Sequence, residues 1–280
     1  MYNASSTLYT QIMRSLVFYY LCAGVSFEIE KIEFQTERSG VETATDFFQP
    51  FQKSLKPFQI MLPQEIEHIF RDDNTLFTAA SHYILAIERQ DFDHYWKAFN
   101  ALFRQNSAAE HDFDQLRDMR SFIEQHHEKF VNTLNLLQSI TAEDVRKLRI
   151  REYILDTFPD ISCTNHFAET VKRFHDVRLA EVFDESLTYR AAFLNTKGLY
   201  GDVANHIAQC KVQNIRDNTE LLCFYVLKYS YFIRNKYFHA EKSAPLFISK
   251  NTMELDELES IGHIFECFLA DLIRCSSCYL

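Results

Sequence analysis

The chain has 280 residues, is 47% apolar and carries a formal net charge of −10 at pH 7, so it is long enough to bury a sizeable core. It contains only five glycines and matches neither GxGxxG nor GxxxxGK[ST], which excludes the glycine-rich nucleotide-binding classes. Because the acidic balance repels nucleic acid and anionic membranes overall, any phosphate-binding site must be local.

The first part of the chain predicts a small module of its own. An apolar stripe indicates a helix over residues 1–24. Apolar and charged residues then alternate over 25–36, which predicts one strand or a strand pair. Glycine and proline mark residues 37–63 as loop and linker. We therefore place a module of unassigned role at residues 1–63.

From residue 64 onward the apolar spacing is helical almost throughout, so the fold class is mainly α. Thr141 and Asp144 form a capping-box sequence at the start of one of these helices. The charged helix at 110–129 has a thin apolar stripe and is expected at the surface. Helices are predicted over 74–89, 92–105, 110–129, 141–157, 164–175, 178–196, 202–212, 219–240 and 255–274.

Cysteine and histidine usage predicts no cofactor. Seven cysteines at irregular spacing, with no secretory signal in front, favour reduced thiols in the cytoplasm. Cys275 and Cys278 have the spacing of a metal clip, but no second pair completes it, and HExxH does not occur. The apolar run at 16–25 is about half of what a bilayer span needs, so we expect no membrane partner.

Polar groups interrupt the apolar helix predicted at 219–240. A long aromatic-rich run contains Arg234, Asn235 and His239. Burying such polar groups without hydrogen-bond partners would cost on the order of several kcal/mol, because each group would lose its hydration. On an ideal helix Asn235 and His239 share a face, and Arg234 lies about 140° from His239. The long arginine side chain can still reach the same cleft.

These three groups suit RNA cleavage without a metal. A neutral His239 imidazole can take the proton of a ribose 2′-OH, and the Arg234 guanidinium can hold the phosphate and stabilise the transition state. Asn235 can orient either partner. The expected products are a 2′,3′-cyclic phosphate and a 5′-OH end. A single imidazole leaves the general acid missing, and a second subunit could supply it.

The charge around the motif is positive. Between residues 228 and 250 there are five basic residues and one acidic residue, and we assign Lys236 and Lys242 to RNA binding. The same charges would also suit a solvated helix end, where cations complement the helix dipole. The residues alone leave both interpretations open.

The string Arg234-Asn235-Lys-Tyr-Phe-His239 resembles the R-N-x-x-x-H motif of the HEPN-domain superfamily. Upstream, Trp96-Lys-Ala-Phe99-Asn100-Ala-Leu-Phe103 resembles the helix that opens many stand-alone prokaryotic HEPN proteins. Together the two matches cover roughly residues 80–275, with inserted helices at about 110–215. Looser R-x4-H and R-x5-H strings at 89–94 and 120–126 are treated as coincidences.

The resemblance implies a HEPN-type up-and-down helical bundle at residues 64–280 that acts as a homodimer. It implies a metal-independent endoribonuclease, a toxin or anti-phage effector, with Arg234, Asn235 and His239 as catalytic residues. RNA and an antitoxin or regulatory protein would be the partners. The alternative is a non-catalytic helical module that binds RNA, a nucleotide or another protein.

Overall fold

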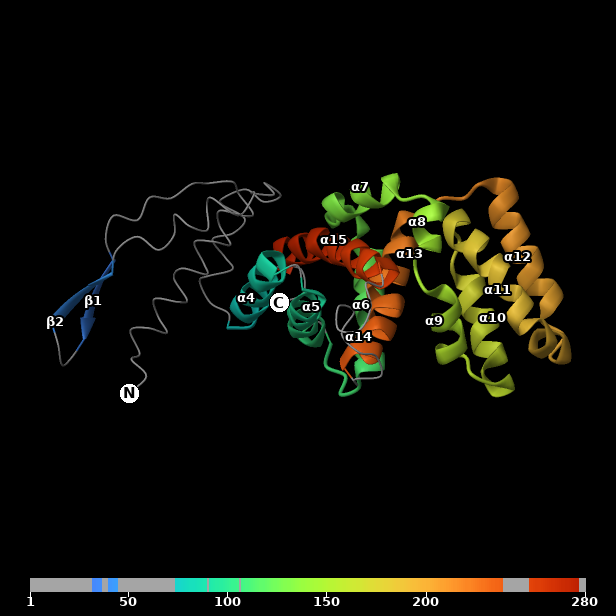
Figure 1. The fold of residues 1–280 in the computed structure, drawn as a ribbon, viewed down its shortest axis with the longest axis horizontal. Coiled ribbons are helices and arrows are strands. Elements are labelled where there is room, and N and C mark those ends of the chain that lie inside the picture. The colour runs from blue at the N-terminus through green and yellow to red at the C-terminus, as the bar shows by residue number, and fades with distance from the viewer. Residues whose placement is uncertain are drawn as a thin grey trace. The chain divides into compact units, whose positions relative to one another are not determined.

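A computed structural model describes residues 32–36, 40–44, 74–89, 91–105, 107–238 and 252–276. The predicted fold class is confirmed, because the described chain is mainly α (Figure 1). It divides into two compact units, Met1–Gln115 with Phe268–Leu280, and Leu116–Cys267. Within the described ranges, no helix combines the length and the apolar character that crossing a bilayer requires.

A two-stranded sheet lies within residues 1–63, for which the sequence predicted one strand or a strand pair. Strand β1 (Ile32–Thr36) pairs antiparallel with β2 (Gly40–Ala44), with Thr36 opposite Gly40. The second strand was predicted as loop, and that prediction is wrong. Gly40 is a turn signal, but the β-branched Val41 and Thr43 that follow it favour a strand. The helix predicted over residues 1–24 lies outside the described residues.

Two helices of the first unit follow the predicted bounds. They are α4 (Asn74–Arg89) and α5 (Phe92–Gln105), which pack against each other. Asp91 caps α5, since its carboxylate accepts a hydrogen bond from the backbone N–H of Asp93 at 3.0 Å. Phe99 is fully buried and meets the ring of Phe268 edge-on at 5.6 Å between centroids. Trp96 is also core, as its helical spacing indicates.

All regular secondary structure among the described residues of the second unit is helical. Helices α10, α11 and α12 lie side by side and pack on one another (Figure 1). Its elements are α6 (Asp112–Gln125, which begins before the unit boundary), η1 (His127–Lys129), α7 (Val131–Ser139), α8 (Ala142–Arg146), α9 (Ile150–Thr157), η2 (Ile161–Cys163), α10 (Thr164–Arg173), α11 (Val177–Thr196), α12 (Tyr200–Gln213), α13 (Asn218–Cys223), η3 (Phe224–Tyr229), α14 (Ser230–Phe238) and α15 (Thr252–Arg274, which continues into the first unit).

The helix predicted over 141–157 is divided in two. Its capping box is confirmed, with Thr141 Oγ1 accepting from the Asp144 N–H and the Asp144 carboxylate accepting from the Thr141 N–H. The break comes at Arg149, whose backbone N–H donates to the Tyr229 hydroxyl at 2.7 Å and the Glu257 carboxylate at 3.2 Å. These partners are far away in sequence, so local periodicity could not indicate the break.

The run predicted as one helix over 219–240 is helical from 218 to 238, but its middle segment η3 is π-helical. The Ser230 hydroxyl donates to the carbonyl of Val226 within this region. Phe224, Tyr225 and Tyr229 are fully buried, so most of this segment lies in the core. A π-helical turn changes the rotation of every residue that follows it, including those of α14.

A buried ion pair holds the start of α11. Asp176 caps this helix by accepting from the backbone N–H groups of Arg178 and Leu179. The Arg178 side chain, 1% exposed, donates to both oxygens of the same carboxylate. It also donates to the carbonyl of Leu137 at 2.7 Å and to Asn218 Oδ1 at 2.8 Å. One guanidinium thereby joins the ends of α7, α11 and α13.

Candidate functional site

Helix α14 carries the first two residues of the predicted motif next to each other. Arg234 Nη1 donates to Asn235 Oδ1 at 2.9 Å, and the guanidinium carbon lies 5.9 Å from the centroid of the Tyr231 ring. All three residues are partly exposed. The guanidinium is therefore oriented by an amide and an aromatic face while it still reaches solvent.

The remaining two positions of the motif region lie outside the described residues. His239, the predicted base, follows the end of α14, and Lys242 follows it in turn. The spatial relation between Arg234 and His239 therefore remains a prediction. The same holds for the pairing of two such motifs across a dimer.

Lys236, predicted to bind RNA, lies within reach of a carboxylate of the same unit. Its ammonium forms an ion pair with Asp156 of α9 and lies 5.7 Å from the centroid of the Phe232 ring. The Lys236 side chain is 17% exposed. A phosphate would have to compete with Asp156 for this cation.

Lys228 belongs to the positive segment in the sequence but is half-buried on η3. Burial, together with the nearby charges of Arg173 and Arg120, lowers the pKa of the Lys228 ammonium. The positively charged segment at residues 228–250 thus includes a lysine that is partly buried in the protein.

Arg89 and His94, the two ends of the R-x4-H string treated as a coincidence, lie close together in the first unit. Arg89 ends α4 and His94 lies in the first turn of α5, so a break between two helices separates them. Arg89 Nη1 nevertheless lies 3.4 Å from His94 Nε2, and His82 Nδ1 lies 3.3 Å from His94 Nδ1. Because it brings an arginine and a histidine together, this group provides a control for the experiments below. In the other string, Arg120 is bonded to Glu124 and Glu220, at 2.6 Å and 2.5 Å.

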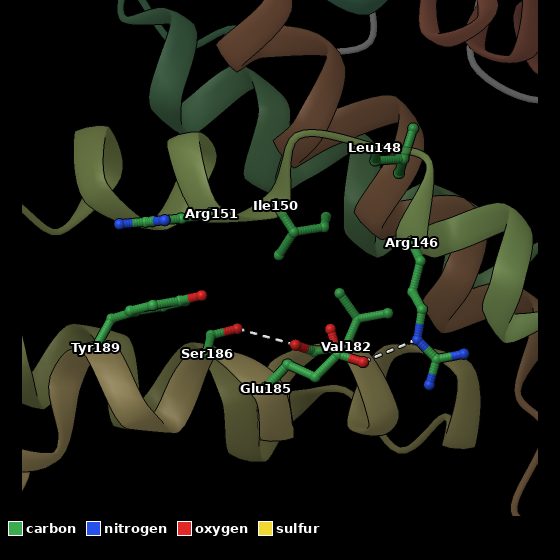
Figure 2. A pocket seen from close by; sticks show the side chains of 8 residues that line it. All are labelled: Arg146, Leu148, Ile150, Arg151, Val182, Glu185, Ser186 and Tyr189. Atoms are coloured by element: carbon green, nitrogen blue, oxygen red, sulfur yellow. Dashed lines mark hydrogen bonds and ion pairs between the residues drawn. The ribbon is translucent and has the colours of Figure 1, made fainter. Parts of the chain in front are cut away.

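A pocket of about 150 Å³ lies between the α8–α9 segment and α11 (Figure 2). Its lining includes Arg146, which is bonded to Glu185 at 2.8 Å, and Arg151, which lies over the Tyr189 ring at 4.6 Å. Ligand pockets usually measure about 300–1,000 Å³. This cavity is too small for a nucleotide and its cations are already engaged, so we assign it no function.

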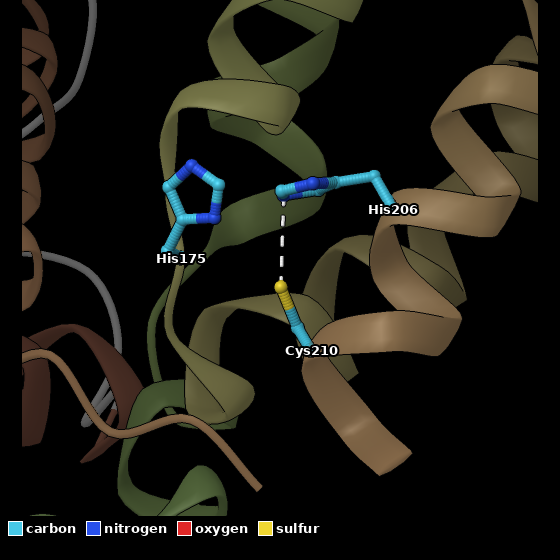
Figure 3. Close-up of side chains that lie close together, drawn as sticks. All are labelled: His175, His206 and Cys210. Atoms are coloured by element: carbon cyan, nitrogen blue, oxygen red, sulfur yellow. Dashed lines mark hydrogen bonds between the residues drawn. The ribbon is translucent and has the colours of Figure 1, made fainter. Parts of the chain in front are cut away.

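Three metal-ligating side chains converge elsewhere in the second unit (Figure 3). His206 and Cys210 lie one turn apart on α12, and His175 comes from the segment between α10 and α11. The sequence predicted no metal site. The i, i+4 spacing of His206 and Cys210 on a predicted helix was the available signal. The third group joins them only through tertiary packing.

In Cys275-Ser-Ser-Cys278, Cys275 is buried and its thiol donates to the carbonyl of Leu272 at 3.5 Å, whereas Cys278 lies outside the described residues.

Comparison of the chain with protein-family models finds no match, and neither does comparison with curated proteins or with solved structures.

Proposed function

We propose that the protein is a HEPN-type, metal-independent endoribonuclease whose active site is built on the C-terminal end of α14. Arg234 binds and stabilises the scissile phosphate, Asn235 orients the guanidinium, and His239 transfers the proton. Two chains contribute one motif each to a shared site, which supplies the second imidazole. A role as a toxin or anti-phage effector belongs to the same proposal.

The hydrogen bond between Arg234 and Asn235 is the observation that carries this proposal. A surface arginine that served only the helix dipole would need no oriented partner. Here the amide oxygen holds one edge of the guanidinium, and the Tyr231 ring lies beside it. Such preorganisation lowers the cost of aligning a cation with the charge that develops on the phosphate.

The chemistry needs no metal. His239 Nε2 or Nδ1 removes the 2′-OH proton, the 2′ oxygen attacks phosphorus, and the P–O5′ bond breaks. The imidazolium of the second chain returns a proton to the 5′ oxygen. Proton transfer by a positioned imidazole contributes about 10²–10⁴-fold. The partial exposure of Arg234 and Asn235 is what access of a polynucleotide requires.

The test is RNA cleavage by the purified protein in excess EDTA, with product ends identified by sequencing. Cleavage with cyclic phosphate ends is expected for the natural sequence. His239→Ala should lower the rate by at least about 10²-fold with an unchanged melting temperature. Arg234→Lys should also lose activity, because an ammonium cannot replace the two-pronged guanidinium.

Two matched histidine variants serve as controls. His127→Ala removes an exposed imidazole away from the motif and should leave cleavage intact. His94→Ala disrupts the group with Arg89 and should likewise leave it intact. Loss of cleavage in His94→Ala instead of His239→Ala would move the active site to the first unit. No cleavage by the natural protein, together with RNA binding, would favour the non-catalytic alternative.

A further inference from the structure

The cluster formed by His175, His206 and Cys210 is a second site, distinct from the proposed nuclease centre. We propose that these three side chains bind one divalent zinc-class metal ion, with the fourth coordination position held by water. The site joins α12 to the segment between α10 and α11. It does not depend on the proposed nuclease function.

The distances within the cluster are close to those of a tetrahedral site. The ligand atoms of the three residues all lie within 4.8 Å of one another. His206 Nε2 and Cys210 Sγ are 3.6 Å apart. Zinc bound at about 2.0 Å from nitrogen and about 2.3 Å from sulfur separates the two ligands by about 3.5 Å. The spacing of this pair therefore already matches two corners of a tetrahedral zinc site.

The third ligand needs only a small movement. His175 is exposed, and its ring centroid lies 4.9 Å from that of His206 at an interplanar angle of 75°. A rotation about its side-chain bonds can bring a ring nitrogen about 1 Å closer, to the separation that tetrahedral geometry needs. The side chain is exposed, so this rotation does not require a buried ring to move.

Metal binding would change the proton positions within the cluster. His206 Nε2 lies 3.2 Å from the carbonyl oxygen of Phe174. On coordination through Nε2 the ring proton moves to Nδ1, and the Cys210 thiol releases one proton to solvent.

The ligand types favour a zinc-class ion. Cys210 is 1% exposed, and burial is the largest cause that raises the pKa of its thiol. The negative charge of the Asp176 carboxylate raises it further. Arg178 already pairs with this carboxylate, so the ligand types, and not the local charge, select the metal. Imidazole and thiolate together select zinc-class ions over magnesium or calcium, which prefer oxygen ligands.

The experiment is a Co²⁺ titration of the chelator-treated full chain. Tetrahedral coordination by nitrogen and sulfur gives visible ligand-field bands and a near-ultraviolet thiolate-to-cobalt band. We expect saturation at about one equivalent per chain and loss of both bands when Zn²⁺ is added. Zinc should also raise the melting temperature, because it binds the folded state.

Cys210→Ser should abolish the thiolate band. His175→Gln changes an exposed residue, so it should leave the metal-free fold intact while weakening Co²⁺ binding at least about tenfold; even loss of an outer-shell partner costs that much. Cys163→Ser and His127→Gln are the matched controls, a half-buried thiol and an exposed imidazole outside the cluster, and should titrate normally.

A thiolate band that persists in Cys210→Ser, or equal affinity in His175→Gln, would overturn the assignment and indicate adventitious binding. Absence of any band in the natural protein would overturn it too. These results leave the nuclease test unaffected, since cleavage is measured in EDTA. Conversely, an inactive protein that still binds one Co²⁺ would refute the nuclease and retain the metal site.

Discussion

Replacing Arg178 by methionine should destabilise the second unit strongly. The guanidinium is 1% exposed and forms a two-pronged pair with Asp176, with Nε to Oδ1 at 2.9 Å and Nη2 to Oδ2 at 2.6 Å. Methionine fills much of the volume but carries no donor. The Asp176 carboxylate and the carbonyl of Leu137 would each lose a buried partner.

Breaking a buried ion pair by removing one partner costs about 3–5 kcal/mol. Asp176 would keep the backbone N–H groups of Arg178 and Asp217, at 2.9 Å and 2.8 Å. These donors stabilise the remaining charge and place the expected loss toward the lower end of that range. The free energy of unfolding is measured by urea denaturation at pH 7, followed by circular dichroism.

Arg146→Met is the matched control. Arg146 bonds to Glu181 at 3.1 Å and Glu185 at 2.8 Å, but its side chain is 36% exposed, so water replaces the lost partners and the loss should be much smaller. Arg178→Lys should fall between the two, because it keeps the charge and loses the fork. Equal destabilisation by Arg178→Met and Arg146→Met, or a loss below about 1 kcal/mol for the former, would refute the reasoning.

Three further substitutions test local features. Asp144→Ala removes half of the capping box and should cost about 1 kcal/mol at pH 7. The pKa of Asp144 is lowered from 3.8 to about 2, with the hydrogen bond from Lys147 as the largest cause. The stabilisation is therefore present above pH 3.8, and denaturation at a series of pH values should show the cost of the substitution shrink as the pH falls toward about 2. Tyr229→Phe removes the hydroxyl that donates to the Glu257 carboxylate and should cost about 1–2 kcal/mol in urea unfolding, and no loss would show that the bond is not needed. Asn214 ends α12 with φ of 48°, a left-handed conformation that strains alanine more than glycine. The free energy of unfolding of Asn214→Ala should therefore be about 1–2 kcal/mol lower than that of Asn214→Gly, and the reverse order would contradict that geometry.

The candidate site was predictable only where its residues are neighbours in sequence. Arg234 and Asn235 are adjacent on one helix, so their contact follows from local geometry once the helix is recognised. The pairing of Lys236 with Asp156 joins α14 to α9 and was not predictable in that way. The same is true of His175, which approaches His206 and Cys210 only because α10, α11 and α12 pack together.

The sequence by itself determined the mainly α class and the bounds of α4 and α5. Apolar spacing and caps such as Asp91 act within a few residues, so they are legible without knowledge of distant partners. Tertiary structure decided the break at Arg149, the π-helical turn and the buried pair of Asp176 and Arg178. Each of these depends on hydrogen bonds or packing between remote segments, and burial, which gives those contacts their energy, exists only after the chain has folded.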